Sequence, residues 1–161
     1  MDEKNILKKQ KESSIIIYQS ADGKTKIDVK LENENIWLNQ KQMSDLFGVE
    51  VPAVLKHIKN IFEVGELSED STISKMEIVQ QEGERLVKRE ITFYNLDAII
   101  SVGYRVNSIT AVHFRQWATQ KLKEYIIKGF VLDDERLKLA KNNYFDELLE
   151  RIRDIRSSEK V

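Results

Sequence analysis

Residues 38–62 read LNQKQMSDLFGVEVPAVLKHIKNIF, a pattern that predicts two short helices separated at Gly48. Asn39 can cap the first helix, and the side chain of Gln42, three residues later, can accept a hydrogen bond from the backbone N–H of Asn39, as in a capping box. Gly48 can end this helix because a residue without Cβ takes the positive φ of a sharp helix end at low cost. Pro52 suits the first turn of the second helix, where its missing N–H is not needed. The spacing is that of a helix-turn-helix.

The second helix has an apolar side and a polar side. Its apolar residues recur at three- and four-residue intervals, which predicts a buried face made of Val51, Val54, Leu55, Ile58, Ile61 and Phe62. The polar side carries Glu50, Pro52, Ala53, Lys56, Lys59 and Asn60. In a helix-turn-helix the start of the second helix enters the major groove, so Glu50, Lys56, Lys59 and Asn60 are candidate DNA contacts.

His57 follows Lys56 and is a further candidate for phosphate contact. Pro52 and Ala53 offer little to base edges, so phosphate contact is better supported by the sequence than base-specific readout. An ordinary helical hairpin packed in a core would show the same two amphipathic helices.

The composition is that of a globular protein with one core. The chain has 161 residues, of which 41% are hydrophobic and 33% are charged. No apolar run approaches the roughly 20 residues of a membrane span, and the first residues are charged where a signal peptide would be apolar. We therefore expect an intracellular protein without a membrane partner. The absence of Cys and the wide separation of the two histidines predict no disulfide and no metal site.

A net charge of −1 means that any DNA footprint has to be local. The basic residues of the stretch 105–128 outnumber its single acid, Glu124, and they are Arg105, Arg115, Lys121, Lys123 and Lys128. This stretch predicts a phosphate-binding surface that uses Arg105, Arg115, Lys121 and Lys123.

Two hairpins flank the predicted helix-turn-helix. Apolar alternation predicts strands at 14–19, 25–31, 36–38, 73–79 and 86–94. Turns are expected at Asp22-Gly23 and around Gly83, and residues 1–13 are expected to be a flexible N-terminus.

A hairpin directly after a helix-turn-helix is the order found in winged-helix proteins, where the hairpin lies beside the duplex. Four basic residues are available for this contact: Lys75, Arg85, Lys88 and Arg89. Four acids balance them, namely Glu77, Glu82, Glu84 and Glu90, and alternating signs are also typical of cross-strand pairs on a solvated face. Both interpretations stay open, with Arg89 as a candidate DNA contact.

The rest of the chain predicts helices. Asn95 can cap one that ends near Gly103. A longer one, 108–128, ends at Gly129 and carries a single apolar stripe that we expect to be buried, namely Phe114, Trp117, Ala118, Leu122, Tyr125 and Ile126. Asp133 can cap a last helix that reaches about Ser157. Its near-heptad seam consists of Leu137, Tyr144, Leu148, Ile152 and Ile155. We expect this apolar seam to be buried against another surface, either that of the domain itself or that of a second copy of the chain. The helix is therefore a candidate for homodimerisation.

No catalytic constellation is visible. The chain has no Gly-rich phosphate loop, no nucleophile elbow and no histidines one helical turn apart. The acidic run 133–135 is explained by a helix cap and by the positive end of the helix dipole. We expect neither catalytic residues nor a cofactor.

Several stretches resemble the RhuM family of bacterial proteins, also called virulence protein RhuM. They are LFGV at 46–49, HIKNIF at 57–62, YNLD at 94–97, IISVGYRVNS at 99–108, FRQWAT at 114–119 and LKEYIIKGFVLDDERL at 122–137. The resemblance implies a cytoplasmic bacterial protein that binds DNA, similar in its central part to Bro-N and KilA-N type phage and viral DNA-binding domains. Members often occur near mobile elements and restriction-modification genes, and the resemblance implies no catalytic residue.

Two departures from the family pattern matter. Relatives carry polar or hydroxyl residues at the positions of Pro52 and Ala53, so the contacts made there in relatives do not carry over. Members are also usually longer, some with a Fic-like region downstream, so this chain resembles their N-terminal portion.

Together these observations predict an α+β protein. A small antiparallel sheet of two hairpins surrounds a helix-turn-helix in a winged-helix-like order, and a helical half ends in a long amphipathic helix. We expect a flexible terminus at 1–13, a DNA-binding domain at 14–130 and a C-terminal helix at 131–161. The expected function is non-enzymatic DNA binding. The alternative is a protein-interaction or adaptor module that acts through the last helix.

Overall fold

The computed structural model describes residues 14–19, 26–32, 35–139 and 144–159. The expected flexible terminus 1–13 and the Asp22-Gly23 turn lie outside these residues. The chain divides into two compact units, one up to Ala118 and one from Thr119 onward, and each is described by itself.

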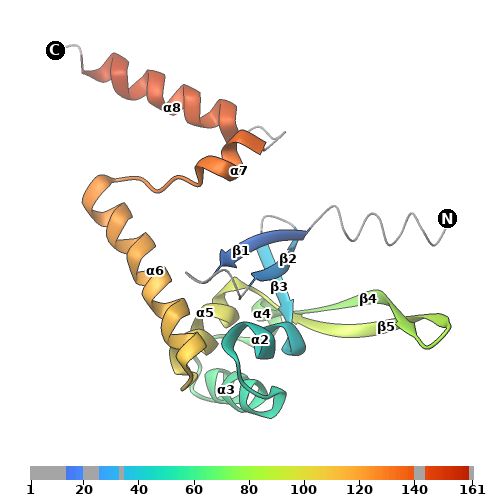
Figure 1. The fold of residues 1–161 in the computed structure, drawn as a ribbon. Coiled ribbons are helices and arrows are strands. Elements are labelled where there is room, and N and C mark those ends of the chain that lie inside the picture. Colours follow the sequence, from blue (N-terminus) through green and yellow to red (C-terminus); the bar gives the residue numbers. More distant parts are fainter. Residues whose placement is uncertain (1–13, 20–25, 33–34, 140–143, 160–161) are drawn as a thin grey trace. The chain divides into compact units, whose positions relative to one another are not determined.

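The strands of the first unit form one antiparallel sheet in the order β1-β2-β3-β5-β4 (Figure 1). The strands are β1 (Ser14–Gln19), β2 (Lys26–Glu32), β3 (Asn35–Asn39), β4 (Ile73–Glu82) and β5 (Arg85–Tyr94). β3 joins the two predicted hairpins because its Leu38 and Asn39 pair with Tyr94 and Phe93 of β5. The α+β class and the two antiparallel hairpins are thus confirmed.

The β4–β5 hairpin is longer than the sequence pattern predicts. Its ladder runs from Ile73 opposite Tyr94 to Glu82 opposite Arg85, which leaves a two-residue loop in which Gly83 has a φ of 60°. The extension beyond Val79 consists of polar residues, and the alternation of apolar side chains could not indicate it. Backbone pairing continues there because it requires no apolar side chain.

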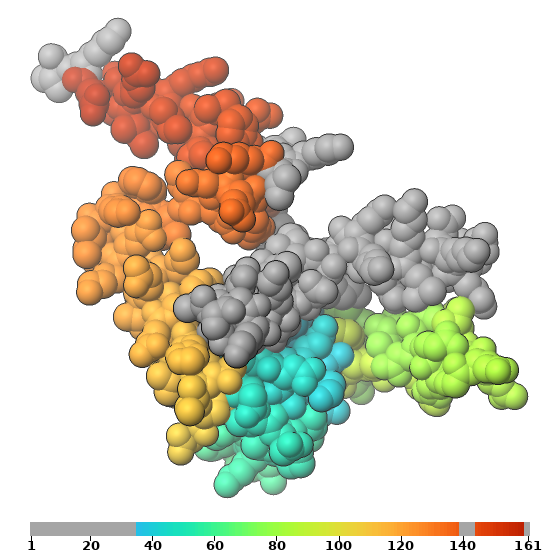
Figure 2. Space-filling view, viewed as in Figure 1, coloured from blue at the N-terminus to red at the C-terminus, as the bar shows by residue number. Residues whose placement is uncertain are grey.

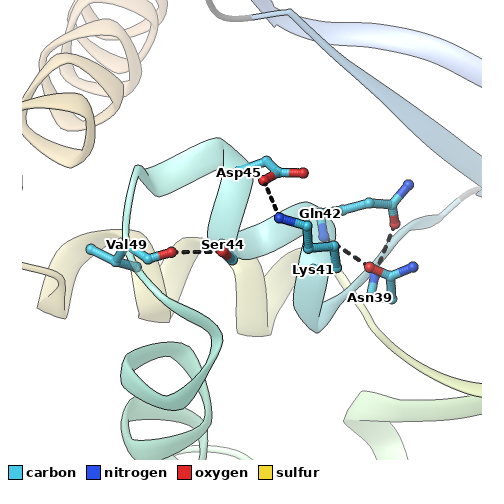
Figure 3. Close-up of polar contacts among 6 residues, drawn as sticks. All are labelled: Asn39, Lys41, Gln42, Ser44, Asp45 and Val49. Carbon is cyan, nitrogen blue, oxygen red and sulfur yellow. Dashed lines mark hydrogen bonds and ion pairs between the residues drawn. The ribbon is translucent and has the colours of Figure 1, made fainter.

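The helices are α2 (Gln40–Phe47), α3 (Val51–Glu63), α4 (Glu69–Thr72), α5 (Leu96–Arg105), α6 (Ile109–Lys128), α7 (Asp134–Leu139) and α8 (Tyr144–Ser158). The predicted capping box at the start of α2 is confirmed (Figure 3). The backbone N–H of Gln42 donates to Asn39 Oδ1 at 2.8 Å, and the backbone N–H of Asn39 donates to Gln42 Oε1 at 2.9 Å.

Asn95 caps α5 as predicted and also joins three segments. Its Oδ1 accepts from the backbone N–H of Ala98 at 3.2 Å, and its Nδ2 donates to the Ser71 carbonyl at 3.1 Å. Its backbone N–H donates to the Thr72 carbonyl at 3.0 Å. These bonds satisfy an amide that is only 4% exposed. The short helix α4, for which the sequence shows no apolar periodicity, begins at Glu69 in the polar stretch before β4.

The core of the first unit lies among α2, α3, α5 and the first half of α6. Its buried members are Leu38, Met43, Leu46, Phe47, Val54, Ile58, Ile61, Tyr94, Ala98, Ile99, Val102, Val106, Ala111 and Phe114. The Phe47 and Phe114 rings meet edge to face with centroids 5.2 Å apart. The predicted end of α5 near Gly103 was wrong: the helix continues to Arg105, and Gly103 lets these rings approach the helix backbone.

The buried faces of α3 and α6 contain fewer residues than the sequence pattern predicts. On α3, Val54, Ile58 and Ile61 are buried, but Leu55 is 40% exposed because it lies at the edge of the apolar arc. On α6, Phe114 is buried and Trp117 packs at the edge of the core, and within the described part of the chain the core takes no later residue of this helix. The end of the expected stripe, Leu122, Tyr125 and Ile126, is exposed, so the single buried stripe was wrong.

The second unit contains the rest of α6 with α7 and α8. Asp133 caps α7 as predicted, since its Oδ1 accepts from the backbone N–H of Arg136 at 3.1 Å. Residues 140–143 lie outside the described residues, so the continuity of the expected last helix falls outside them too. α8 has no buried residue.

We predict that Gly103→Ala destabilises the protein by about 1–3 kcal/mol, because the overpacked methyl group meets two aromatic rings. An ideal Cβ at this position would lie 2.7 Å from Phe114 Cε1 and 2.9 Å from Phe47 Cε1. A loss of stability would be informative, because alanine in place of glycine stabilises a helix interior by about 1 kcal/mol where space permits. Helix propensity alone therefore predicts the opposite sign for the change in the free energy of unfolding.

Chemical denaturation monitored by circular dichroism measures the change. Ile100→Ala, on the exposed side of the same helix, is the control and should have a smaller effect. A Gly103→Ala variant as stable as the wild type would contradict the packing described here.

Candidate nucleic-acid interface

A three-residue turn between α2 and α3 fixes the angle at which α3 leaves the core. Gly48 has φ 64° and ψ 39°, and a Cβ there would lie 2.9 Å from Thr110 Oγ1. Ser44 Oγ donates to the Val49 carbonyl at 2.6 Å, and the Val49 backbone N–H donates to the Ser44 carbonyl at 3.2 Å (Figure 3). Substitution of Gly48 would therefore meet both backbone strain and a neighbouring side chain.

The side of α3 opposite the core carries most of the candidate reading residues. We name as the α3 outer face the exposed residues Glu50, Pro52, Lys56, Lys59 and Asn60. Lys59 Nζ lies 3.7 Å from the Glu63 carboxylate, a distance typical of a loose surface pair of little energetic value. The face thus presents two lysines, together with one acid at its N-terminal end.

His57 and Arg105 lie next to the α3 outer face but have other surroundings. Arg105 donates to Glu66, and Ser101 Oγ donates to the other carboxylate oxygen of Glu66 at 3.0 Å. The bond from Arg105 is the main reason why the pKa of Glu66 is lowered. The pKa of His57 is also lowered, first by burial and then by the positive charges of Lys56 and Arg105. A site with these cations favours an anion and leaves His57 mostly neutral at pH 7.

Arg115 is directed at the end of α5. Its Nη1 donates to the Gly103 carbonyl at 2.9 Å and to the Val106 carbonyl at 3.0 Å, and the side chain is half-buried. These carbonyls belong to the last turn of a helix, where intrahelical partners are missing. Arg115 therefore closes α5 in this structure, a role that the charge pattern of 105–128 did not indicate.

Arg89, the candidate on the hairpin, forms a two-bond pair with Glu82. Its Nε and Nη2 donate to the two carboxylate oxygens at 3.0 and 2.9 Å. This pair raises the pKa of Arg89 and lowers that of Glu82. Of the two interpretations of the hairpin charges, the structure contains the cross-strand pair at this position.

The remaining candidates belong to the second unit. Lys121 and Lys123 are exposed on α6. Of the five seam residues, Leu137 is on α7, and Tyr144, Leu148, Ile152 and Ile155 share α8. Leu148 is half-buried, whereas Ile152 and Ile155 are exposed.

The structure thus brings together Lys56, His57, Lys59 and Asn60 on α3 and Glu50 at its N-cap, with Arg105 near His57. Sequence reasoning missed Glu66 and Ser101, which hold Arg105. Glu66 lies in a polar stretch without periodicity, 39 residues before its partner, so no local signal could have identified it.

In the part of the chain that the structure describes, no helix is long and apolar enough to cross a membrane. The same residues contain no group of three or more His, Cys, Asp or Glu side chains placed to hold a metal ion.

Comparisons with curated proteins and with solved structures find no match. Comparison with protein-family models finds one: residues 71–161 match the model described as the Virulence protein RhuM family. The matched stretch includes β4, β5 and all helices from α5 onward. Because the match covers more than half of the chain, the protein belongs to the RhuM family of virulence proteins.

Proposed function

We propose that this protein binds DNA through a helix-turn-helix formed by α2 and α3, with the α3 outer face toward the major groove. The observation that carries the proposal is the contrast between the two sides of α3. Val54, Ile58 and Ile61 anchor one side in the core, while Lys56 and Lys59 are exposed on the other. A helix held in this way can present its cations to a phosphate backbone with little loss of conformational entropy.

The connectivity around this unit supports the proposal. β3 precedes α2 and α3, and β4 and β5 follow them, with β5 lying between β3 and β4 in the sheet. A winged helix has this order of elements, and the β4–β5 hairpin would then take the place of the wing.

The side chains suggest a division of roles. Lys56, Lys59 and His57 suit phosphate contacts beside α3, and Lys121 and Lys123 of the second unit are proposed on their own as phosphate contacts of α6. Asn60 can pair with adenine and Glu50 can accept from cytosine, so these two residues are the proposed base contacts. Arg105 adds positive potential beside His57 while it keeps its bond to Glu66. The proposed role is binding without catalysis.

We predict that Lys56→Ala/Lys59→Ala weakens binding to a labelled random-sequence DNA duplex by roughly tenfold at low salt, because two phosphate contacts are lost. The slope of log affinity against log salt should become shallower by about 2, roughly one for each lost contact. Fluorescence anisotropy at several ionic strengths measures both quantities.

Lys138→Ala is the matched control, since Lys138 is an exposed lysine of α7 outside the proposed interface. Wild-type protein that does not bind the duplex at low salt would remove the proposal. If the double variant bound DNA with an unchanged salt dependence, the protein would still bind DNA, but through a surface other than α3.

We also predict that binding strengthens by at least about twofold when the pH falls from about 7.5 to about 5.5, because a histidine gains its charge in this range and His57 lies beside the proposed phosphate contacts. In the free protein the pKa of His57 is lowered, whereas a nearby phosphate would raise it. As the pH falls, the affinity begins to rise near the pKa that His57 has in the complex. The increase is complete once the pH is below the pKa that His57 has in the free protein.

Anisotropy titrations across this pH range provide the measurement. His57→Gln should remove the dependence, whereas His113→Gln should keep it, because His113 lies exposed on α6. If the two variants behave alike, His57 does not meet phosphate.

The exposed apolar seam of α8 favours a second candidate, a protein-interaction module. An isolated helix of this length is marginal in water, and Ile152 and Ile155 are 43% and 63% exposed. In this alternative α8 pairs with a second copy or with a helix of another protein. In a parallel pair of α8 helices, Arg151 of one copy would lie beside Arg156 of the other, and these like charges would repel. An antiparallel pair avoids this contact and is therefore preferred.

If α8 pairs with itself, Ile152→Lys should weaken self-association at least about tenfold, because a charge enters the centre of an apolar seam. Light scattering coupled to size-exclusion chromatography measures the mass over a dilution series. Glu150→Lys places the same side chain away from the seam and should leave the mass unchanged. An unaltered mass for Ile152→Lys would contradict self-pairing through α8.

A further inference from the structure

Most of the β4–β5 hairpin extends beyond the sheet as a two-stranded ribbon. β4 and β5 pair over ten residues each, but β3 pairs with β5 only at Phe93 and Tyr94. Figure 1 shows the ribbon projecting from the helices of the first unit, and Figure 2 shows the same segment standing out from α2 and α3. Two-stranded ribbons are marginal in water without a third strand or a packed face.

β4 is the terminal strand of the sheet in the described residues. A long edge strand is a template for pairing with another strand, and proteins usually protect such edges with bulges, prolines, short lengths or charged side chains, of which β4 has the charged side chains Lys75 and Glu77. The ladder of β4 runs without a register shift from Ile73 to Glu82, and these residues contain no proline. The edge is therefore regular enough to accept a partner strand.

The charges of the hairpin favour a protein partner over phosphates. Residues 73–94 carry four basic and four acidic side chains, and two of these, Arg89 and Glu82, are bonded to each other. Glu77 lies directly opposite Glu90 in the ladder, and directly opposed like charges destabilise a sheet. A cation from outside the hairpin, placed beside Glu77, would relieve this repulsion.

We infer that β4 pairs antiparallel with β4 of a second copy of this chain, about a two-fold axis that passes beside Met76. Such an axis, perpendicular to the sheet, keeps each face continuous and makes every contact occur twice. Lys75 then lies opposite Glu77 of the second copy, and Glu77 lies opposite its Lys75. Both side chains are exposed in the single chain. The sheets of the two copies join into one, and each Glu77–Glu90 pair gains a lysine.

Other registers lack this complementarity. An axis beside Lys75 would oppose two lysines, and an axis beside Glu77 would oppose two glutamates. An axis beside Ile78 or Val79 would place Lys75 opposite Gln81 or Gly83, so no pair of opposite charges forms. The charge pattern of β4 therefore selects one register.

Charge-reversal variants test the pairing in the full-length chain, by sedimentation velocity over a dilution series. The wild type should have the mass of a dimer. Lys75→Glu and Glu77→Lys should each weaken dimerisation roughly tenfold, since two attractive pairs become repulsive. At a dilution at which the wild type is also monomeric, Glu77→Lys should keep or raise the melting temperature, because it removes the Glu77–Glu90 repulsion within the chain. This opposite sign separates loss of assembly from loss of folding.

Mixing provides the decisive measurement. At a protein concentration at which the Lys75→Glu and Glu77→Lys variants are each mostly monomeric alone, their mixture should form a dimer, because every opposed pair in the mixed dimer has opposite charges. Lys88→Glu alters an exposed lysine on β5 and is the control, for which dimerisation should be unchanged. Ile152→Lys distinguishes this interface from α8, because it leaves a β4 dimer intact.

Three results would overturn the inference. They are a monomeric wild type at all concentrations, single variants that dimerise like the wild type, and a mixture that stays monomeric. An assembly abolished by Ile152→Lys but insensitive to the charges of β4 would assign self-association to α8 instead.

Discussion

The approach of the Phe47 and Phe114 rings to the backbone at Gly103 is the contact on which the first unit depends. It brings the end of α2, the last turn of α5 and the start of α6 to one point. Ser108 reinforces this junction, since its Oγ donates to the Phe47 carbonyl at 2.5 Å and accepts from the backbone N–H of Ala111. Because α3 begins four residues after Phe47, its direction follows from this packing and from the left-handed turn at Gly48.

The sequence was informative wherever a structure is decided by neighbours along the chain. The caps at Asn39, Asn95 and Asp133, the turn at Gly48 and the two hairpins all depend on residues within a few positions of one another. The polar side of α3 could be predicted for the same reason, since helical periodicity alone separates Lys56 and Lys59 from the core.

The remaining differences arise from contacts between distant segments. Arg115 and Arg105 were expected at a phosphate surface because of their charge, but each has a partner that folding supplies: the carbonyls at the end of α5 for one and Glu66 for the other. The end of α5 was misplaced because glycine commonly ends a helix, whereas here two aromatic rings explain its presence. In each case the deciding contact comes from a distant segment, which a local pattern does not contain.

The buried amide of Asn95 has a mechanical consequence. The chain enters β4 just after Ser71 and Thr72 and leaves β5 at Tyr94, and the hydrogen bonds of Asn95 tie these two ends together at the start of α5. The base of the hairpin is thus held to the start of α5 by the hydrogen bonds of a single residue, Asn95. A load applied near Gly83 would be transmitted as a torque to the first turn of α5, and so toward the aromatic junction further along the same helix.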